Sequence, residues 1–361
     1  MSLPVTSITR AFGLGLPVIQ APMAGGATTP ELVAAVCNAG ALGSFAAATL
    51  APQAIRVGVK RIRELTDRPF GVNLFVLQAP QPDPAAIARA NLLLAPFRAE
   101  LGLPQAAPPL ARYCEDPQEQ FEALVEARPA LASFAFDVHG AAQVERLHAA
   151  GCLVAGSATN VAEARAWESA GADFICAQGI EAGGHRGTFI GSVEDSLIGC
   201  MALVPQIVDA VRLPVIAAGG IMDGRGIAAA LMLGAAAAQM GTAFLNCVES
   251  GIHPAWKAAL RGAGDTATRV TLAFSGRMAR GINNDFMRRM AAHQEEVPAY
   301  PVQNALTGEM RAAAARQNQA QYMSLWAGQG VALARTLGAA ELIDTLGAEL
   351  RAALARGAAS A

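Results

Sequence analysis

The chain has 361 residues, of which 53% are hydrophobic and 16% are charged, and its formal net charge is −2. This composition supplies a large apolar core and excludes a disordered chain. Because there is no basic run and no excess of positive charge, we expect neither nucleic acid nor an anionic membrane as a partner. The length predicts one large domain or two small ones.

The cysteines and the N-terminus bear on the compartment. The six cysteines are scattered and include no CxxC pair, so we expect free thiols in a reducing environment and no metal site. The opening MSLPVTSITRAFGLGLPVI lacks the charged segment and apolar core of a signal peptide, which favours a cytoplasmic location. Gly226–Leu245 is uncharged over 20 residues, but its Ala and Gly content and the break at Gly234 predict a buried helix and strand rather than a membrane span.

Eight short apolar runs predict strands. They are continuous rather than alternating, which favours a parallel sheet covered on both faces. In chain order the expected strands are Val18–Ala21, Ala41–Phe45, Phe70–Phe75, Leu131–Phe136, Cys152–Gly156, Asp173–Ala177, Pro214–Ala218 and Ala237–Met240.

Helical segments separate most of these runs, several with a capping residue in front and a glycine behind. The expected helices are Pro30–Ala39, Ala141–Ala150, Ala162–Ala170, Met201–Val211 and Gly224–Leu233. Eight such units predict an α/β fold, a closed (β/α)₈ TIM barrel. The alternative is an open doubly wound sheet, which would need a Gly-rich phosphate loop after an early strand. PMAGGATTP after the first strand contains glycines but is not GxGxxG.

Two segments lie outside the repeating pattern. Leu77–Glu119, rich in Pro and Ala, predicts an insertion after the third strand that lies over one end of the barrel. Beyond Leu245 the chain is predicted to be helical, with a polar loop at His293–Tyr300 and an amphipathic helix or helix pair at Val331–Gly357. We therefore expect a barrel over residues 1–250 and a helical extension, residues 251–361, packed on it.

Polar side chains interrupt the apolar runs where a barrel of this kind carries its active site, at the carboxyl ends of the strands. Asn73, Gln178 and Gln239 are costly to bury without hydrogen-bond partners. Three amides that converge on one barrel mouth indicate a planar, hydrogen-bonding ligand.

Glycines follow the seventh and eighth strands: the pair Gly219-Gly220 after the seventh, and Gly241, followed by Thr242, after the eighth. Backbone N–H groups at these two strand ends form the usual phosphate site of the barrel, and a threonine hydroxyl can add a donor. The alternative is that the glycines only close tight turns. Their occurrence on both of the expected strands favours a phosphate-bearing cofactor.

The segment ICAQGIEAGGHRGTF places His185 after a predicted strand and a double glycine, Gly183-Gly184, with Arg186 next to it. The glycines allow the backbone to approach a flat ligand, and histidine suits proton transfer or anion stabilisation near neutral pH. The alternative is a surface loop. The other histidines have weaker contexts: His148 and His293 are surface-like, His253 has no partner signal, and His139 just past the fourth strand is intermediate.

Five of these stretches, IQAPMAGG, GVNLF, AQGIEAGGHRGTF, VIAAGGIMDGRGIAAALMLGA and QMGTAFL, resemble the FMN-dependent nitronate monooxygenases, formerly called 2-nitropropane dioxygenases. FSGRMARGINN and YPVQNALT are similar to the class I branch. The motifs are specific as a set and extend from about Leu16 to about Gln329. The resemblance implies a nucleotide-binding flavoprotein oxidoreductase that uses FMN and O2 to oxidise alkyl nitronates, propionate 3-nitronate among them, to a carbonyl compound and nitrite.

The resemblance also implies roles for individual residues. Met23 is expected at the edge of the flavin, Asn73 and Gln178 as hydrogen-bond partners of its ring, and Gly183 facing it. His185 is expected to be the catalytic histidine. The ribityl phosphate is expected at Gly220, Gln239, Met240, Gly241 and Thr242.

One departure from the class I pattern concerns the substrate. The family motif S-F-H-F-G has a histidine where SFAFD of this chain has Ala135, and His139 is the candidate to replace it. Tyr113, Tyr300 and Ser275 are further candidates for polar groups of the pocket.

Three other functions remain open. FMN-dependent enoyl-acyl-carrier-protein reductases have a similar EAGGH loop and use NAD(P)H, and NADH:quinone reductases belong to the same superfamily; the long C-terminal region and YPVQN argue against both. The third is a non-catalytic barrel that binds a phosphate ligand. The expected partners are a small-molecule nitronate and O2, with a homodimer left open.

Overall fold

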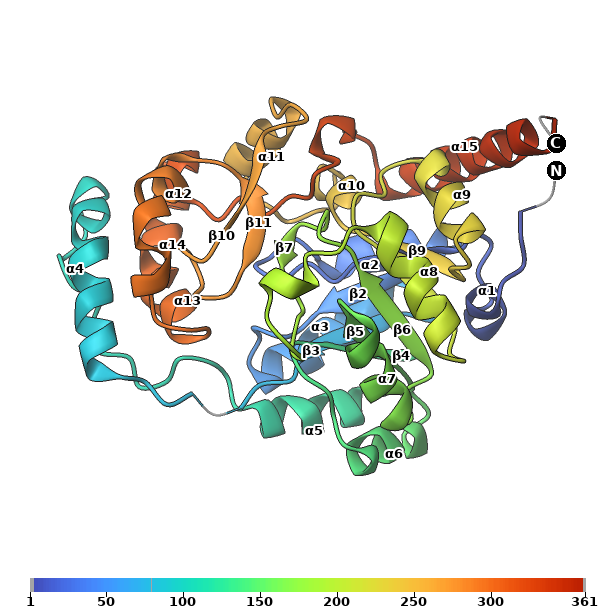
Figure 1. The fold of residues 1–361 in the computed structure, drawn as a ribbon, viewed down its shortest axis with the longest axis horizontal. Coiled ribbons are helices and arrows are strands. Elements are labelled where there is room, and N and C mark those ends of the chain that lie inside the picture. The colour runs from blue at the N-terminus through green and yellow to red at the C-terminus, as the bar shows by residue number, and fades with distance from the viewer. Residues whose placement is uncertain (1–2, 79, 360–361) are drawn as a thin grey trace.

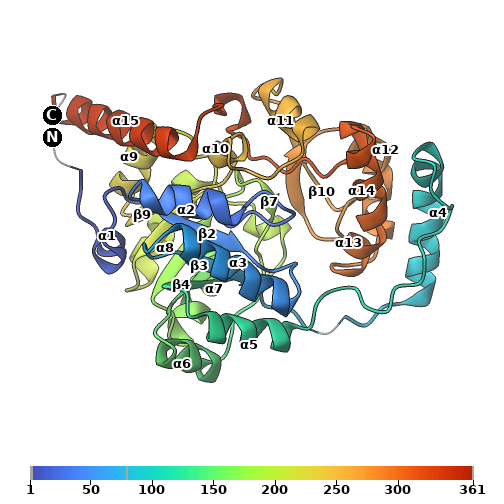
Figure 2. The same ribbon diagram turned by 180° about the vertical axis from the view of Figure 1, so that it is seen from behind.

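The computed structural model describes residues 3–78 and 80–359. Eight parallel strands close into a barrel, which confirms the (β/α)₈ fold and excludes the open sheet (Figures 1 and 2). The strands, in their order around the barrel, are β1 (Val18–Gln20), β2 (Leu42–Ala46), β3 (Gly71–Phe75), β4 (Leu131–Ala135), β5 (Leu153–Ala158), β6 (Phe174–Gln178), β8 (Val215–Ala218) and β9 (Ala237–Met240).

Helices surround the barrel as the alternating pattern predicts. They are α2 (Pro30–Asn38), α3 (Pro52–Leu65), α5 (Pro117–Ala127), α6 (Ala141–Ala149), α7 (Val161–Ser169), α8 (Cys200–Ala210), α9 (Gly224–Met232) and the short α10 (Thr242–Leu245). The side chains of Thr29, Asn160 and Asp223 cap α2, α7 and α9, as expected from the sequence. The uncharged segment 226–245 is therefore helix α9 followed by strand β9 and α10, and no described helix is long and apolar enough to cross a membrane.

The barrel is closed at its N-terminal end. Helix α1 (Ser7–Phe12) buries Ile8 and Phe12 against the interior side chains of the strands, with the Phe12 and Phe174 rings 5.7 Å apart. A larger apolar layer lies between the strands and the surrounding helices. Polar groups are thus left for the opposite, carboxyl end of the barrel.

A second, antiparallel sheet lies beside the barrel, with the strand order β10-β11-β7. Its strands are β7 (Gly184–His185), β10 (Thr268–Thr271) and β11 (Ala279–Ile282). In the register of this sheet, His185 lies opposite Ala279. The sequence predicted that the region after residue 250 is helical, but it also contains strands β10 and β11. Through β11 this region pairs with the loop that carries His185.

The remaining helices after residue 250 are α11 (Pro254–Arg261), α12 (Asp285–Arg289), α13 (Val302–Leu306), α14 (Gly308–Arg316) and α15 (Ala339–Ala359). Helix α15 packs on α9 and α2, and its Leu346 and Leu350 are buried in the outer layer of the barrel. The amphipathic tail therefore packs on the barrel, as expected. The division of the chain at residue 250 stays a prediction, since the second apolar core combines residues 252–331 with Ala27 and Leu245.

The insertion does not lie where the sequence analysis put it. Its helix α4 (Pro84–Glu100) lies along the outside of α12–α14, at the edge of the molecule (Figures 1 and 2). Leu94 and Phe97 enter the second apolar core, and the fully buried Arg98 bonds Glu309 at 2.6 Å. These contacts draw the insertion away from the barrel mouth.

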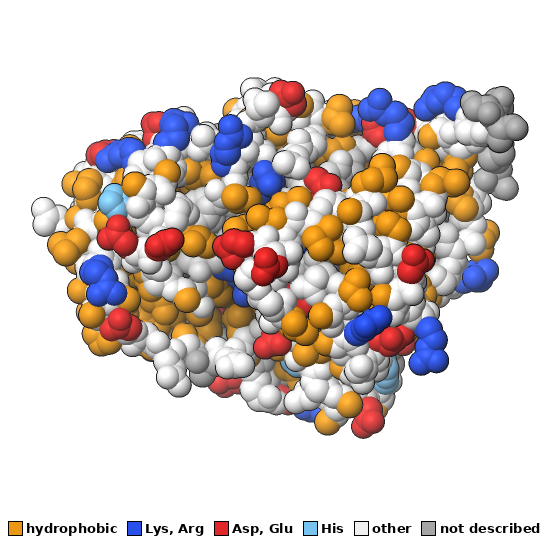
Figure 3. Space-filling view, in the orientation of Figure 1, with side chains coloured by type: hydrophobic (Ala, Val, Ile, Leu, Met, Phe, Trp, Pro, Cys, Tyr) orange, Lys and Arg blue, Asp and Glu red, His pale blue; other side chains and the backbone are white. Residues whose placement is uncertain are grey.

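On the face shown in Figure 3, acidic and basic side chains are interspersed and form no basic patch.

Candidate active site

A cavity of about 620 Å³ lies at the carboxyl end of the barrel strands. The barrel contributes Met23, Asn73, Phe75, Ala135, Phe136, Gln178, Gly183, His185, Gly220, Gln239, Gly241 and Thr242 to its lining. The C-terminal region contributes His253, Trp256, Tyr300, Asn304, Arg311, Met323, Ser324 and Trp326. No described residue of 77–119 lines it, so the C-terminal region rather than the insertion covers the mouth.

One end of the cavity fits a phosphate. The positive φ of Gly220, +71°, is a conformation that favours glycine. The backbone N–H groups of Gly220, Gly241 and Thr242 have no acceptor in the described part of the chain. Thr242 Oγ1 accepts a hydrogen bond from Gly328 N at 2.9 Å, which leaves its own proton free to donate. A Cβ on Gly241 would lie 3.6 Å from Ala21 Cβ, so the packing of the protein itself does not require glycine there.

The three amides differ in how far the protein engages them. Asn73 Nδ2 donates to Ser133 O and Oγ at 3.0 and 3.1 Å, while its Oδ1 receives no hydrogen bond from the described residues. Gln239 Nε2 contacts Cys176 Sγ at 3.2 Å. Met240, in contrast, buries its side chain in the layer outside the barrel and does not line the cavity. Of the residues expected at the cofactor, Met240 alone has its side chain outside the cavity lining.

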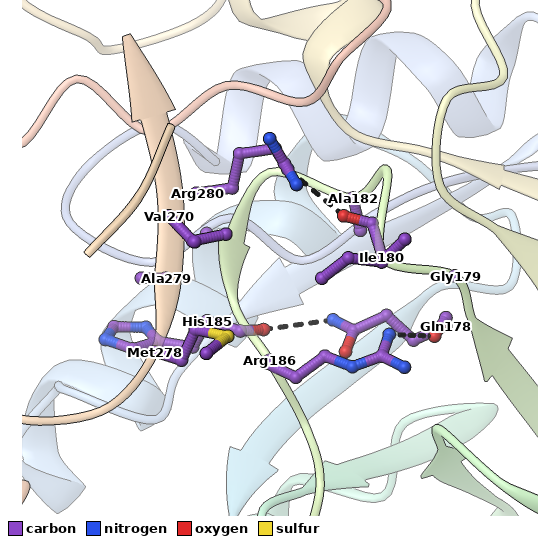
Figure 4. A pocket seen from close by; sticks show the side chains of 11 residues that line it. Gln178, Gly179, Ile180, Ala182, His185, Arg186, Val270, Met278, Ala279 and Arg280 are labelled. Atoms are coloured by element: carbon purple, nitrogen blue, oxygen red, sulfur yellow. Dashed lines mark hydrogen bonds between the residues drawn. The ribbon is translucent and has the colours of Figure 1, made fainter. Parts of the chain in front are cut away.

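Gln178 holds the loop that carries His185. Its Nε2 donates to His185 O at 3.0 Å (Figure 4), and its Oε1 accepts from Gly187 N at 2.8 Å. Both ends of the amide are therefore used to fix the loop. Gln178 also lines the cavity, and each end of its amide keeps one hydrogen-bonding position, so the expected bond to the flavin ring stays a prediction.

The double glycine after β6 has two separate causes. Gly184 has a φ of +73°, which favours glycine. A Cβ on Gly183 would lie 2.5 Å from Gly328 N, because the segment 326–330 crosses the loop at this point. Gly183 lines the cavity as expected, yet chain crossing alone already requires it to be glycine.

His185 is oriented by Ser275 and enclosed by aromatic rings. Its Nε2 lies 2.9 Å from Ser275 Oγ, and that hydroxyl donates to Arg277 O at 3.1 Å. Since the hydroxyl proton is used there, we assign the imidazole proton to Nε2, which leaves the Nδ1 lone pair unengaged. The rings of Phe136, Tyr300 and Trp326 lie 5.5 to 5.6 Å from the imidazole.

The imidazole is neutral at physiological pH. Burial lowers the pKa of His185 to about 3, and the positive charges of Arg277 and Arg311 lower it further in the same direction. His185 is therefore suited to accept a proton and cannot supply positive charge at pH 7. That charge comes from the two arginines.

The sequence analysis missed Arg277 and Arg311. Burial lowers the pKa of each to about 10, so both are cations at pH 7. Arg311 Nη2 donates to Asn304 O at 2.7 Å, and its buried Nε has no partner. Neither guanidinium forms an ion pair with a carboxylate of the described chain. Arg277 lies in the stretch FSGRMARGINN, which resembles the family, whereas Arg311 lies beyond YPVQNALT, and only their partial burial distinguishes the two from surface arginines.

Phe136 adopts a strained backbone next to these groups. Its φ is +85°, a region in which a non-glycine residue costs about 1–3 kcal/mol. This conformation stacks its ring on Phe75, with centroids 4.1 Å apart, and places it under the Arg277 guanidinium at 4.0 Å. The strain is thus offset where the aromatic wall of the cavity meets a buried cation.

His139 does not occupy the place of the histidine that the resemblance leads us to expect at position 135. Its ring lies 4.6 Å from Phe134 and 5.1 Å from Phe121, and it does not line the cavity, whereas Ala135 does. Burial lowers the pKa of His139 to about 4. It is a partly buried histidine, neutral at pH 7, that packs against aromatic rings.

The other polar candidates fall into two groups. Tyr300 lines the cavity, and Ser275 acts through His185, while Tyr113 lies outside the lining residues. His253, which carried no signal in the sequence, lines the cavity and caps α11 through a bond from Ala255 N to its Nδ1 at 3.2 Å. His148 and His293 lie at the surface in pairs with acidic residues, as predicted. All six cysteines are free thiols, and no cluster of potential metal ligands occurs among the described residues.

Comparison with known proteins gives one consistent family. The family model described as "Nitronate monooxygenase" matches residues 8–349. A nitronate monooxygenase of Pseudomonas aeruginosa is 46% identical over 95% of this chain and 98% of its own, and a probable nitronate monooxygenase of Bacillus subtilis is 42% identical over 93% and 96%.

Among solved structures, a nitroalkane oxidase is more similar to this chain than an enzyme named FabK is. A nitroalkane oxidase from Streptomyces ansochromogenes has a TM-score of 0.89 and 43% identity, with coverage of 97% of this chain and 99% of that one. FabK from Thermotoga maritima is less similar, with a TM-score of 0.76, 28% identity, and coverage of 99% and 100%.

Proposed function

The chain belongs to the nitronate monooxygenase family, and from this premise we propose that it oxidises nitronates with FMN held in the cavity at the barrel mouth. The observation that supports FMN is the group of free donors at one end of that cavity. The N–H groups of Gly220, Gly241 and Thr242 and the Thr242 hydroxyl have the chemistry of a phosphate site. Asn73 Oδ1 is a free acceptor for a flavin N–H further along the cavity.

The protein's own contribution to the reaction is binding, charge and a base. When bound, FMN supplies the electron acceptor for oxidation of the nitronate. Arg277 and Arg311 supply positive potential for the anionic nitro group, and the aromatic wall around His185 excludes water, which strengthens that interaction. For a neutral nitroalkane, His185 Nδ1 would accept the Cα proton.

A cavity-lining arginine without a carboxylate partner, Arg311, favours a substrate with a second negative charge. Arg311 in particular has an unused Nε–H, and it lines the cavity beside Asn304. We therefore propose a nitronate with a second anionic group, of which propionate 3-nitronate is the simplest candidate. A neutral quinone or an uncharged enoyl chain would leave the Arg311 cation uncompensated.

The test has two steps. The protein freed of flavin is first titrated with FMN and followed by flavin fluorescence; tight binding is expected. The loaded protein is then assayed in air with propionate 3-nitronate and with a simple alkyl nitronate, and oxygen uptake and nitrite release are measured. Rapid anaerobic bleaching by NADH without nitrite production from either nitronate would instead support a reductase.

The homodimer and the cytoplasmic location stay predictions.

A further inference from the structure

We propose that Glu163, on helix α7 outside the barrel, is a positioning residue for the active site: it holds the loop that seats Arg277 and is the counter-charge of that arginine. The inference rests on the proposed function, because the site that it serves is the one that binds the nitronate. Glu163 touches neither the cavity nor His185.

The carboxylate of Glu163 is fully buried, with 0% exposure. Its Oε2 accepts from Thr159 N at 2.6 Å and from Thr159 Oγ1 at 2.8 Å. Its Oε1 accepts from Phe189 N at 2.6 Å and from Ile190 N at 3.0 Å. All four donors are neutral, and no cation forms an ion pair with it in the described chain. A buried charge so fully bonded fixes the groups that surround it.

The loop held by Glu163 seats Arg277 from its other side. Arg277 Nε donates to Arg186 O at 3.1 Å, and its Nη2 donates to Thr188 O at 2.5 Å. The hydroxyl of Thr188 also lies 2.8 Å from that of Thr159. Residues 186–190 thus connect the carboxylate to the guanidinium, and Arg277 reaches the Phe136 ring beside His185 only while this segment keeps its place.

Charge acts in the same direction as geometry. Burial lowers the pKa of Arg277, and Glu163 is the strongest of the charges that oppose this, followed by Tyr300 and Asp137. Glu163 likewise opposes the lowering of the pKa of Arg186. Of the other ionisable groups near Arg277, His185 is neutral and Arg311 is a like charge, so neither stabilises the cation.

The test uses Glu163→Gln, which keeps the size of the side chain and removes its charge. Nitrate, a planar anion, is titrated calorimetrically into the FMN-loaded protein between pH 7 and pH 10. We expect about 3- to 10-fold weaker binding at pH 7. The fall in affinity toward high pH should begin about one pH unit lower than in the parent, because Arg277 loses its counter-charge. KM for the nitronate should rise more than kcat falls.

The matched control is Glu168→Gln on the same helix, where the carboxylate accepts from the surface residue Arg212 N at 2.7 Å. It removes a similar bond away from the site and should leave the nitrate profile unchanged. Glu163→Asp keeps the charge but shortens the side chain. We expect it to bind nitrate more weakly than the parent at every pH, with the fall in affinity toward high pH beginning at the same pH as in the parent. If Glu163→Gln does not fold, Glu163→Asp still tests the proposal. Nitrate affinity of Glu163→Asp equal to that of the parent would show that the placement of the carboxylate does not matter for the site.

Three results would overturn the proposal. One is parent-like nitrate affinity of Glu163→Gln across the range. Another is nitrate binding by Glu163→Gln that is weaker by the same factor at every pH, which would show that Glu163 is not the counter-charge of Arg277. The third is an equal effect of Glu168→Gln, which would indicate general destabilisation. Failure of the proposed function is separate: the parent would then bind nitrate but release no nitrite from nitronates.

Discussion

Ser275 Oγ lies 2.9 Å from His185 Nε2 and so joins the C-terminal region to the barrel loop at the proposed reaction centre. Ser275 is 1% exposed and lies just before β11, the strand that pairs with β7. The same region that covers the cavity therefore also sets the tautomer of the imidazole. The C-terminal extension therefore contributes directly to the proposed active site.

His185→Asn should separate two classes of substrate. FMN should stay bound, because the phosphate and ring partners lie elsewhere. Turnover of a neutral nitroalkane should fall by about 10²–10⁴-fold, the usual contribution of a general base, and that of a preformed nitronate by much less. Since the pKa of His185 is lowered to about 3, the parent's kcat/KM for the nitroalkane should show no acid limb near pH 6.5. Steady-state rates for both substrates from pH 5 to 9 test this, and equal small losses for both would leave His185 without a catalytic role.

Ser275→Ala should reduce the same proton transfer through orientation alone. The imidazole loses the partner of its Nε2, so the Nδ1 lone pair is no longer fixed toward the substrate. We expect a loss of about 10-fold in kcat for the nitroalkane, or about 1.4 kcal/mol, with FMN affinity unchanged. Ser275→Thr, which keeps the hydroxyl, should recover part of the rate. If alanine and threonine behave alike, the hydrogen bond does not orient the base.

The barrel could be predicted because each strand is a separate apolar run and helical segments, several of them capped, separate most of these runs. The second sheet could not. Strand β7 has two residues, and β10, Thr268–Thr271, places Arg269 and Val270 outward, so neither has a strand-like run of apolar residues. The position of α4 was wrong for a related reason: its composition predicted a helix, but only the second apolar core determines which surface the helix covers.

At the site, the sequence indicated which residue types meet but not how they are used. Gln178 and His185 could be found because a polar side chain at the end of a buried strand is costly unless it has a hydrogen-bond partner or a function. That Gln178 serves the loop, and that His185 is neutral, follow from bonds and burial that no linear pattern contains. Arg277 and Arg311 were missed because sequence spacing does not show whether an arginine meets a carboxylate.

The partly buried His139 should make the fold sensitive to acid. His139 has a folded-state pKa lowered to about 4 from an ordinary value of 6.5, so the unfolded chain binds the proton more tightly. Its contribution is fully present above about pH 6.5 and is lost as the pH falls toward 4. Between pH 7 and pH 5 this amounts to about 2 kcal/mol. Urea unfolding at both pH values should therefore show a smaller acid loss in His139→Phe than in the parent. Equal slopes for His139→Phe and the parent would contradict the lowered pKa of His139.

Arg311→Met should affect the second charge of the substrate. If Arg311 binds a carboxylate, KM for propionate 3-nitronate should rise by about 10- to 100-fold, as expected for a charged hydrogen bond of about 1.5–3 kcal/mol. KM for an uncharged-chain alkyl nitronate should change much less. Arg316→Met, on the exposed face of the same helix, is the control. The comparison is made from initial rates of nitrite release. An equal rise for both substrates would assign Arg311 to the nitro group rather than to a carboxylate.

Gly241→Val tests the phosphate end of the cavity. A Cβ at Gly241 would meet Ala21 Cβ at 3.6 Å and Met23 Sδ at 3.7 Å, which are ordinary contacts, and its φ is −103°, so the fold should tolerate the change. The valine methyl groups, however, would occupy the space from which a phosphate approaches the free N–H groups of Gly241 and Thr242. We expect at least a 10-fold increase in the Kd for FMN, or about 1.4 kcal/mol, with the Tm of the flavin-free protein close to that of the parent. Gly264→Val is the control, because a Cβ there has no neighbour within 4 Å and the residue is remote from the cavity lining. Flavin fluorescence gives the Kd, and differential scanning calorimetry gives the Tm. If Gly241→Val is purified saturated with flavin, the phosphate must bind elsewhere, because a blocked pair of donors could not retain it.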